Sequence, residues 1–326
     1  MPRSLLRTLT ACVVLLLATA GCSSGGEQSG GAAAPPDGAF PVTLNHAFGQ
    51  TTIPKRPERV VALGYNEADF VEALGVQPIA ERQVLGKYPF QQRPWQPNPP
   101  LGPAPQVLGG STVPVEQIAA LKPDLILGVY SYLDKGTYDQ LAKIAPTVAQ
   151  GTPDGSNAAR WDEQTRITGK ALGLEQKADE VIAQTQKKFD EAKAAHPGFA
   201  GKGLSMDFVI SGKPYNFGTD DLRAQIFAGL GFKVRPKTQN LSLEQQGQLD
   251  NDVLVVLGRS KAEAMKDPVF AAIPAVKAGR VAYLGPFDTE FAAALGYSSP
   301  LSLPYLIDKV SPVLDAAQKG QAPELK

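Results

Sequence analysis

Residues that carry most enzyme chemistry are scarce in this sequence. Its 326 residues include 2 histidines, 2 cysteines, 2 tryptophans and 3 methionines. Beyond residue 40 the chain contains no GxSxG, HExxH, Walker A or GxGxxG motif, so no nucleophile elbow, zinc-protease helix or nucleotide loop is predicted. His46 and His196 stand alone in the chain, which leaves no general base of the usual kind. The sequence therefore does not favour an enzyme.

The same scarcity argues against direct binding of a transition metal. Such a site needs several His, Cys, Asp or Glu side chains that converge, and two dispersed histidines do not supply them. Any metal that this protein carries must therefore arrive inside a chelator that brings its own ligands. We therefore predict no metal site in the protein and no resident cofactor.

Net charge is also missing. The 32 Lys and Arg residues balance the 32 Asp and Glu residues, which removes the electrostatic case for binding nucleic acid. Apolar residues make up 43% of the chain and charged residues 20%, as in globular proteins. The length is sufficient for two domains of ordinary size.

The N-terminus has the pattern of an exported, lipid-anchored protein. Residues 1–21 predict a signal peptide, because Arg3 and Arg7 precede an apolar stretch that is too short to span a membrane comfortably. The small residues before Cys22 resemble a bacterial lipobox, although Thr19 stands where Leu is usual. The resemblance implies that Cys22 is acylated, with palmitate among the expected chains, and becomes the mature N-terminus. The alternative is an ordinary secretory signal with a coincidental cysteine.

The stretch from Cys22 onward predicts a flexible tether. Residues 22–40 are rich in Gly, Ser and Ala, and such a stretch has no core to bury. Cys12 would be lost with the signal, so the mature chain would hold one cysteine and no internal disulfide.

One long predicted helix organises the rest of the chain. Residues 174–195 place apolar side chains at spacings of three, four or seven with charges between them, and Pro197 ends the run. The segments before and after it have the same order. A buried strand, a turn and a short helix occur at residues 59–76 and again at 204–232. We therefore predict an α/β protein with an N-terminal lobe (41–156), a bridging helical segment (157–196) and a C-terminal lobe (197–326).

Several motifs in this frame resemble a known family. They are PERVVALGYNEADFVEALGV from residue 57, VPVEQIAALKPDLIL from 113, LAKIAPTV from 141, DPVFAAIPAVKAGRVAYL from 267 and GYSSPLSLPYLIDKV from 296. In this order they resemble the iron-siderophore and cobalamin substrate-binding proteins of ABC importers. The resemblance covers residue 42 to the C-terminus. It implies two Rossmann-like lobes joined by one long helix, a ligand cleft between the lobes and little hinge motion.

A ligand in such a fold should contact the loops at the carboxyl ends of the parallel strands. Aromatic rings there could stack on a chelator, and arginines could pair with its negative charge. Each of these side chains could instead be an ordinary packing residue or a solvated charge. The candidate ligand-binding residues are Tyr65, Asn66, Arg82, Tyr130, Tyr132, Tyr215, Arg259 and Phe287.

A proline-rich segment, residues 81–105, follows one of these strands. It contains seven prolines together with Tyr88, Phe90 and Trp95, and such a stretch should be extended and semi-rigid. Two interpretations stay open, a surface loop without a role and a rim of the cleft.

The resemblance also implies a permease contact, made by one acidic residue on the upper surface of each lobe. In the first lobe Asp69 stands where relatives carry that acid, and Glu67 is close enough to substitute. In the second lobe the corresponding position is Gln225, a departure from the pattern, so Asp220 or Asp221 is the candidate. All four could instead be acids that favour helix N-termini.

These observations together predict a lipid-anchored binding protein on the outer face of the cell membrane that catalyses no reaction. We expect it to capture a ferric siderophore and deliver it to an ABC permease, as a monomer and without nucleic acid. Two alternatives stay open. One is a protein of the same fold that binds haem or cobalamin, and the other is a docking lipoprotein that transports nothing.

Overall fold

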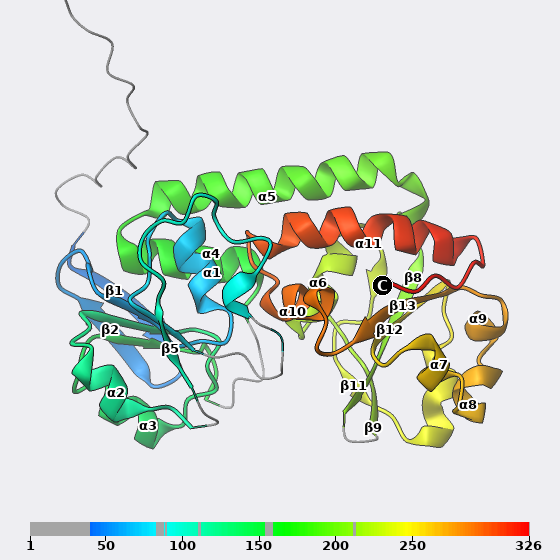
Figure 1. Ribbon diagram of the computed structural model, residues 1–326, viewed down its shortest axis with the longest axis horizontal. Coiled ribbons are helices and arrows are strands. Elements are labelled where there is room, and N and C mark those ends of the chain that lie inside the picture. Colours follow the sequence, from blue (N-terminus) through cyan, green and yellow to red (C-terminus); the bar gives the residue numbers. More distant parts are fainter. Residues whose placement is uncertain are drawn as a thin grey trace, which may run out of the picture. The chain divides into compact units, whose positions relative to one another are not determined.

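A computed structural model describes residues 40–82, 88, 90–109, 112–153, 159–210 and 213–325. The predicted signal peptide, Cys22 and most of the predicted tether lie outside the described residues. The described chain is α/β, with a hairpin followed by two lobes (Figure 1). In the hairpin, β1 (Val42–His46) pairs antiparallel with β2 (Gly49–Ile53).

The N-terminal lobe contains a parallel sheet. In the described chain it has five strands in the order β5-β4-β3-β6-β7. The strands are short and mostly buried because helices lie over the sheet. They are β3 (Val60–Ala62), β4 (Ala80–Arg82), β5 (Gln106–Leu108), β6 (Leu125–Gly128) and β7 (Thr147–Ala149). The helical elements between them are α1 (Glu67–Ala73), η1 (Phe90–Gln92), α2 (Val115–Ala120) and α3 (Lys135–Leu141).

The C-terminal lobe contains a second, separate sheet. Its described strands run in the order β11-β9-β8-β12-β13, with β10 beside β8. Strand β12 is parallel to both β8 and β13, whereas β9 is antiparallel to both β8 and β11. The strands are β8 (Gly203–Ile210), β9 (Lys213–Asn216), β10 (Lys233–Val234), β11 (Gln239–Asn240), β12 (Val253–Gly258) and β13 (Val281–Pro286).

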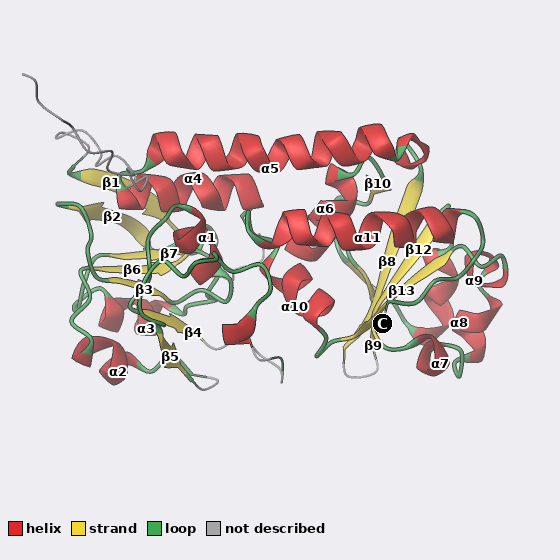
Figure 2. Ribbon diagram, turned by 45° about the horizontal axis from the view of Figure 1, so that its top comes forward, coloured by secondary structure: helices red, strands yellow, loops and turns green. Residues whose placement is uncertain are grey.

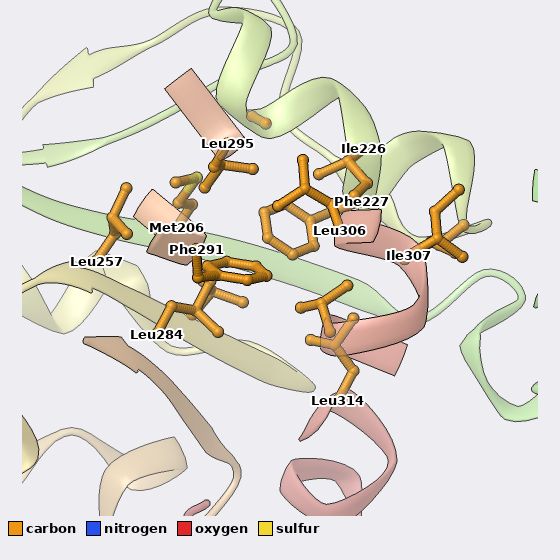
Figure 3. Packing of buried hydrophobic residues seen from close by; sticks show 14 of the residues in the cluster. Met206, Ile226, Phe227, Leu257, Leu284, Phe291, Leu295, Leu306, Ile307 and Leu314 are labelled. Carbon is orange, nitrogen blue, oxygen red and sulfur yellow. The ribbon is translucent and has the colours of Figure 1, made fainter. Parts of the chain in front are cut away.

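Helices cover the second sheet on both faces. On one face they build the largest cluster of buried apolar residues, which includes Met206, Phe227, Leu284 and Leu306 (Figure 3). The helical elements of the lobe are η2 (Pro197–Phe199), α6 (Leu222–Gly229), η3 (Leu243–Leu249), α7 (Lys261–Ala264), α8 (Pro268–Ala272), α9 (Pro274–Lys277), α10 (Glu290–Tyr297) and α11 (Ser302–Gln318).

The predicted bridging helix is confirmed as α5 (Glu175–Ala195), a helix of 21 residues. Its first half places Ala178 and Val181 in the core of the N-terminal lobe, and its second half places Phe189 and Ala192 in the core of the C-terminal lobe. Figure 2 shows the helix lying along both lobes. The two sheets are therefore joined by a helix and do not merge into one.

Helix α4 (Trp161–Leu172) lies against the first half of α5. The two helices approach closely at Gly169, where an added Cβ would come within 2.5 Å of the Ala178 Cβ. Gly173 links them with a φ of 67°, a conformation that favours glycine. The exact lobe boundaries at residues 156 and 196 stay predictions.

Equivalent strands occur in the two lobes. In the first lobe β3, β6 and β7 are adjacent and parallel, and in the second β8, β12 and β13 are adjacent and parallel. A short helical element precedes the middle strand in each case, α2 before β6 and η3 before β12. The structure thus supports the repeat seen in the sequence. In the part of the chain that is described, no helix combines the length and apolar character that crossing a membrane requires.

Candidate functional site

Three tyrosines and an arginine gather at the carboxyl ends of strands in the N-terminal lobe. The ring centroids of Tyr65 and Tyr130 lie 6.2 Å apart, and those of Tyr130 and Tyr132 lie 5.3 Å apart. The Arg82 guanidinium lies 4.3 Å from the centre of the Tyr65 ring. We call these four residues the N-lobe group. All four are sequence-predicted ligand residues, and the structure brings them together.

The strand order explains this gathering. Arg82 is the last residue of β4, Tyr65 follows β3, and Tyr130 and Tyr132 follow β6, and these strands are neighbours in the sheet. Arg82 Nη1 donates to the Ser131 carbonyl at 3.2 Å, which ties the guanidinium to the tyrosine loop. The arrangement presents phenol and guanidinium donors beside flat apolar rings, a combination suited to an oxygen-rich chelate.

Glu67 supports the tyrosine loop from the interior of the lobe. Its carboxylate accepts from the Gln164 side chain at 2.8 Å and from the Tyr130 backbone N–H at 3.4 Å. A Cβ at Gly64 would come within 1.7 Å of Glu67 Oε2, so only glycine leaves room for this carboxyl group. Burial raises the pKa of Glu67 to about 7, although these hydrogen bonds oppose the shift.

A second group of aromatic residues lies in the C-terminal lobe. Phe208 packs against Phe217 at 5.2 Å and against Phe287 at 5.6 Å, and Tyr215 lies 6.2 Å from Phe217. The Arg223 guanidinium covers the Phe217 ring at 4.4 Å. We call these five residues the C-lobe group. Phe287 is 43% exposed, so an apolar face is open to a partner or ligand.

The two groups lie within electrostatic reach of each other. Burial raises the pKa of Tyr130 well above its usual value, and the charge of Arg223 from the other lobe opposes that shift. Arg223 in turn has a raised pKa, because the effect of Asp221, Tyr130 and Tyr132 outweighs that of burial. A small molecule between the lobes would therefore meet phenols from one side and a guanidinium from the other.

Two of the sequence-predicted ligand residues have other partners. Asn66 is 2% exposed, and its side chain donates to the Tyr297 carbonyl at 2.9 Å and accepts from Gln164 at 2.9 Å. It joins the first lobe to α10 of the second. Arg259 pairs with the buried Asp207 and covers the Phe270 ring at 4.5 Å. Neighbouring groups thus already use the Asn66 amide, and Arg259 uses Nη2 on Asp207. Their roles as ligand residues stay predictions.

The expectation that Glu67 and Asp69 lie on the surface needs correction, because both are 0% exposed. Both residues lie in the first turn of helix α1, on the side that faces the protein interior. Asp221 is the N-cap of α6, and its carboxylate accepts from Arg223. Asp220 accepts from the Thr238 backbone N–H at 2.8 Å and its side chain is 18% exposed. Of the four predicted docking acids, only Asp220 and Asp221 retain any exposed surface.

The described part of the proline-rich segment is not a free surface loop, because Arg93 and Trp95 are buried, and its place at the cleft rim stays a prediction. The Arg93 guanidinium makes ion pairs with Asp69 at 3.0 Å, Glu81 at 3.2 Å and Glu72 at 3.4 Å, and its side chain is 0% exposed. We call these four residues the Arg93 cluster. The cluster places three carboxyl groups around one guanidinium in the protein interior. One positive charge therefore has to balance up to three negative charges that have left water.

The Arg93 cluster also connects the two lobes. Asp69 accepts hydrogen bonds from the Trp95 indole at 2.8 Å and from Ser299 Oγ at 2.6 Å. The guanidinium lies 5.1 Å from the centre of the Tyr297 ring, which belongs to α10 of the C-terminal lobe. These contacts tie α1, the proline-rich segment and the region between α10 and α11 together, which should restrict hinge motion.

Burial has the largest effect on the pKa values of the three carboxyl groups in the Arg93 cluster. It raises the pKa of Glu72 to about 7 and raises the pKa values of Asp69 and Glu81, while the positive charge of Arg93 opposes each shift. The pKa of Arg93 is itself raised, since its carboxylate neighbours outweigh the effect of burial, so it stays charged.

Sequence reasoning missed two important residues. Arg223 comes two residues after Asp221, a predicted docking acid, but no pattern in the sequence shows that it points toward the other lobe. Arg93 lies among prolines, where nothing in the local sequence indicates burial. Within the described ranges, no group of three or more His, Cys, Asp or Glu side chains is arranged to hold a metal ion.

Two lobes joined by one helix, with facing aromatic and arginine groups, define a two-lobed solute-binding protein. Comparison with known proteins supports this. The chain belongs to the periplasmic binding protein family, whose profile matches residues 60–286.

Two individual relatives are named as proteins that bind iron complexes. The chain is 28% identical to the ferric-anguibactin-binding protein FatB of Vibrio anguillarum over 265 residues, which cover 75% of this chain and 80% of FatB. It is 28% identical to the Fe(3+)-citrate-binding protein YfmC of Bacillus subtilis, over 72% of this chain and 75% of YfmC.

Solved structures agree with the fold. A periplasmic solute-binding protein of Mycobacterium smegmatis is 33% identical with a TM-score of 0.75, over 85% of this chain and 98% of that one. PiaA of Streptococcus pneumoniae, solved in complex with ferrichrome, is 30% identical with a TM-score of 0.75, over 85% of this chain and 99% of PiaA. The predicted two-lobed fold is thereby confirmed.

Proposed function

We propose that this protein binds a ferric siderophore between its lobes, on the outer side of the cytoplasmic membrane, and delivers it to an ABC importer. The observation that carries the proposal is the pair of facing groups, with Tyr65, Tyr130 and Arg82 on one lobe and Arg223 on the other. Relatives that bind ferric anguibactin, ferric citrate and ferrichrome support it. The chelator would bring the iron with its ligands, which fits a site without metal-ligating clusters among the described residues.

The binding test uses the purified full-length chain in detergent. Titration with ferrichrome, ferric citrate and a ferric tricatecholate should give heat and a change in intrinsic fluorescence, with a Kd at or below about 1 µM for at least one of them. Gallium complexes of the same chelators control for light absorption by iron. If none of these chelates binds, and mixing with the protein shifts the Soret band of haem, then haem binding replaces siderophore binding as the proposed function.

Lipid anchoring at Cys22 is part of the proposal. Several homologues are named as siderophore-binding or substrate-binding lipoproteins, and the sequence before Cys22 resembles a bacterial lipobox except at Thr19. More than one acyl chain on that cysteine would anchor the protein stably beside the permease. The polar sequence between Cys22 and the hairpin would leave the binding lobes free to reach it.

Permease docking requires exposed acids on both lobes, and the internal repeat suggests which. Glu116 lies in the first turn of α2 and Glu244 in the first turn of η3, the elements that precede the equivalent strands β6 and β12. Both side chains are exposed, unlike Glu67 and Asp69. We propose Glu116 and Glu244 as docking acids, while Asp220 and Asp221 remain the alternative in the second lobe.

Charge reversal tests this assignment in cells. Substituting Glu116→Lys together with Glu244→Lys should lower uptake of a labelled ferric siderophore by about tenfold or more, because the new lysines would repel the permease arginines that the family resemblance implies as partners of these acids. The Kd of the purified variant should be unchanged. The matched control is Glu180→Lys with Glu191→Lys, two exposed acids on α5. If the first double variant takes up the siderophore at the unaltered rate, residues other than Glu116 and Glu244 dock the permease.

A further inference from the structure

The sign and amount of charge at the candidate site point to a particular class of siderophore. We infer that the site selects ferric chelates of low net charge, such as trihydroxamates, over strongly anionic ones, and that Asp221 sets this selectivity. The inference rests on the proposed function, because it concerns the ligand of the same site.

The first step is the ion pair between Asp221 and Arg223. Arg223 Nε donates to Asp221 Oδ1 at 2.8 Å and Nη2 donates to Oδ2 at 2.6 Å, which is the two-point geometry of a strong pair. The two side chains are 19% and 18% exposed, so water screens the pair only partly. The positive charge that Arg223 offers to a ligand is therefore largely cancelled by its own neighbour.

The second step is the net charge of the side chains in the N-lobe group and the C-lobe group, with Asp221 included. Arg82 contributes at most +1, Arg223 contributes +1 and Asp221 contributes −1, so these three side chains sum to +1 at most. Arg259 adds nothing to this sum, because Asp207 neutralises it. Tyr130 stays a neutral phenol because burial raises its pKa. A chelate with three negative charges would thus lose much of its hydration and gain at most one positive charge in return.

The third step is what remains available for hydrogen bonding. In the hydrogen bonds of the described residues, Arg223 uses Nε, Nη2 and its backbone N–H on Asp221 and leaves Nη1 unused. On the opposite side the Tyr132 O–H donates to the Tyr130 oxygen at 3.2 Å, which leaves the Tyr130 O–H as the phenol donor for a ligand. Arg223 Nη1 and the Tyr130 O–H are directional donors for carbonyl and hydroxamate oxygens and do not require a highly charged ligand. The protein as a whole has no net charge to steer a polyanion toward the site.

The test compares two iron complexes that differ in charge. Ferrichrome is an uncharged ferric trihydroxamate, and a ferric tricatecholate carries a net charge of about −3. The full-length protein should bind ferrichrome at least about tenfold more tightly, a difference of about 1.4 kcal/mol. Asp221→Asn should tighten tricatecholate binding by about tenfold and change ferrichrome binding by less than about threefold, because the asparagine keeps the cap and removes the charge.

Controls separate this inference from the proposed function. Asp267→Asn makes the same chemical change at the N-cap of α8, where the carboxylate accepts from Val269, Phe270 and Gln246. Among the described residues Arg223 forms its ion pair with Asp221 and not with Asp267, so this variant should leave the preference between the two chelates unchanged. Thermal unfolding of each variant reports whether the fold is intact. Tighter binding of tricatecholate by the unaltered protein, or equal effects of Asp221→Asn on both chelates, would overturn the selectivity and leave siderophore binding standing. Binding of ferric citrate alone would overturn the selectivity and leave the proposed function standing, whereas failure of all three chelates to bind would overturn both.

Discussion

Substituting Arg93→Met should lower the free energy of unfolding by about 3 to 5 kcal/mol at neutral pH, the cost of removing one partner from a buried ionic cluster. Arg93 is the guanidinium that Asp69, Glu72 and Glu81 share, and its side chain is 0% exposed. Methionine fills much of the same volume, so the loss would come from the three carboxyl groups left without a counter-charge and not from a cavity. Because Asp69 also accepts from Ser299, the damage should reach the junction between the lobes.

The loss should depend on pH. In the unaltered protein the folded-state pKa of Glu72 is raised to about 7. Between about pH 4.5 and pH 7 the folded state therefore binds more protons than the unfolded state, and the free energy of unfolding falls as pH rises. Without Arg93 the pKa values of all three carboxyl groups should rise further. The difference between the two proteins should then be small near pH 5 and large near pH 8.

Denaturant unfolding at these two pH values measures the effect. Arg160→Met is the control, because that guanidinium pairs with Asp162 at the surface and is 71% exposed, and it should cost less than about 1 kcal/mol. If Arg93→Met does not fold at neutral pH, Arg93→Met combined with Asp69→Asn, Glu72→Gln and Glu81→Gln should restore folding, since no buried charge then remains. A loss that is equal at both pH values would show that the cluster does not act through its charges.

The local pattern of the sequence was sufficient to predict most elements. Helix α5 follows the predicted range within one residue, and the strands at Val60–Ala62 and Gly203–Ile210 lie where buried apolar runs predict them. Apolar periodicity reports which face of an element is buried, and capping residues report where it ends. Both signals are contained in a short window of sequence, so they can be interpreted without knowledge of the tertiary fold.

The site was only partly accessible to the same reasoning. Tyr65, Arg82, Tyr130 and Tyr132 could be predicted to meet, because strand order places the ends of adjacent parallel strands together. The burial of Asp69 could not be predicted. Its partners are Trp95, 26 residues away, and Ser299, 230 residues away, and no local pattern distinguishes an acid in the first turn of an exposed helix from one that meets a buried arginine. Contacts of this kind depend on the packing of the lobes, which the sequence alone does not display.

The facing groups lead to a second large expected effect. Arg82→Gln and Arg223→Gln should each weaken ferrichrome binding by about 10- to 100-fold, the typical loss of a hydrogen bond from a charged donor. Arg82 belongs to the N-terminal lobe and Arg223 to the C-terminal lobe, and each is already held in place, by the Ser131 carbonyl and by Asp221 respectively. If one ligand contacts both lobes at once, the two losses in binding free energy should add, because the arginines do not share a partner. The double variant should then bind about 100- to 10,000-fold more weakly.

Calorimetry on the four proteins completes this double-mutant cycle. Arg160→Gln with Arg166→Gln is the matched control, since both guanidiniums are exposed and pair with Asp162 of α4. The Kd of this control variant should equal that of the unaltered protein. The Kd of the double variant could instead equal the larger of the two single-variant Kd values. That result would mean that the ligand contacts one lobe only. Additive losses would instead assign the ligand to the space between the lobes, where phenols from one sheet and a guanidinium from the other can hold the same chelate.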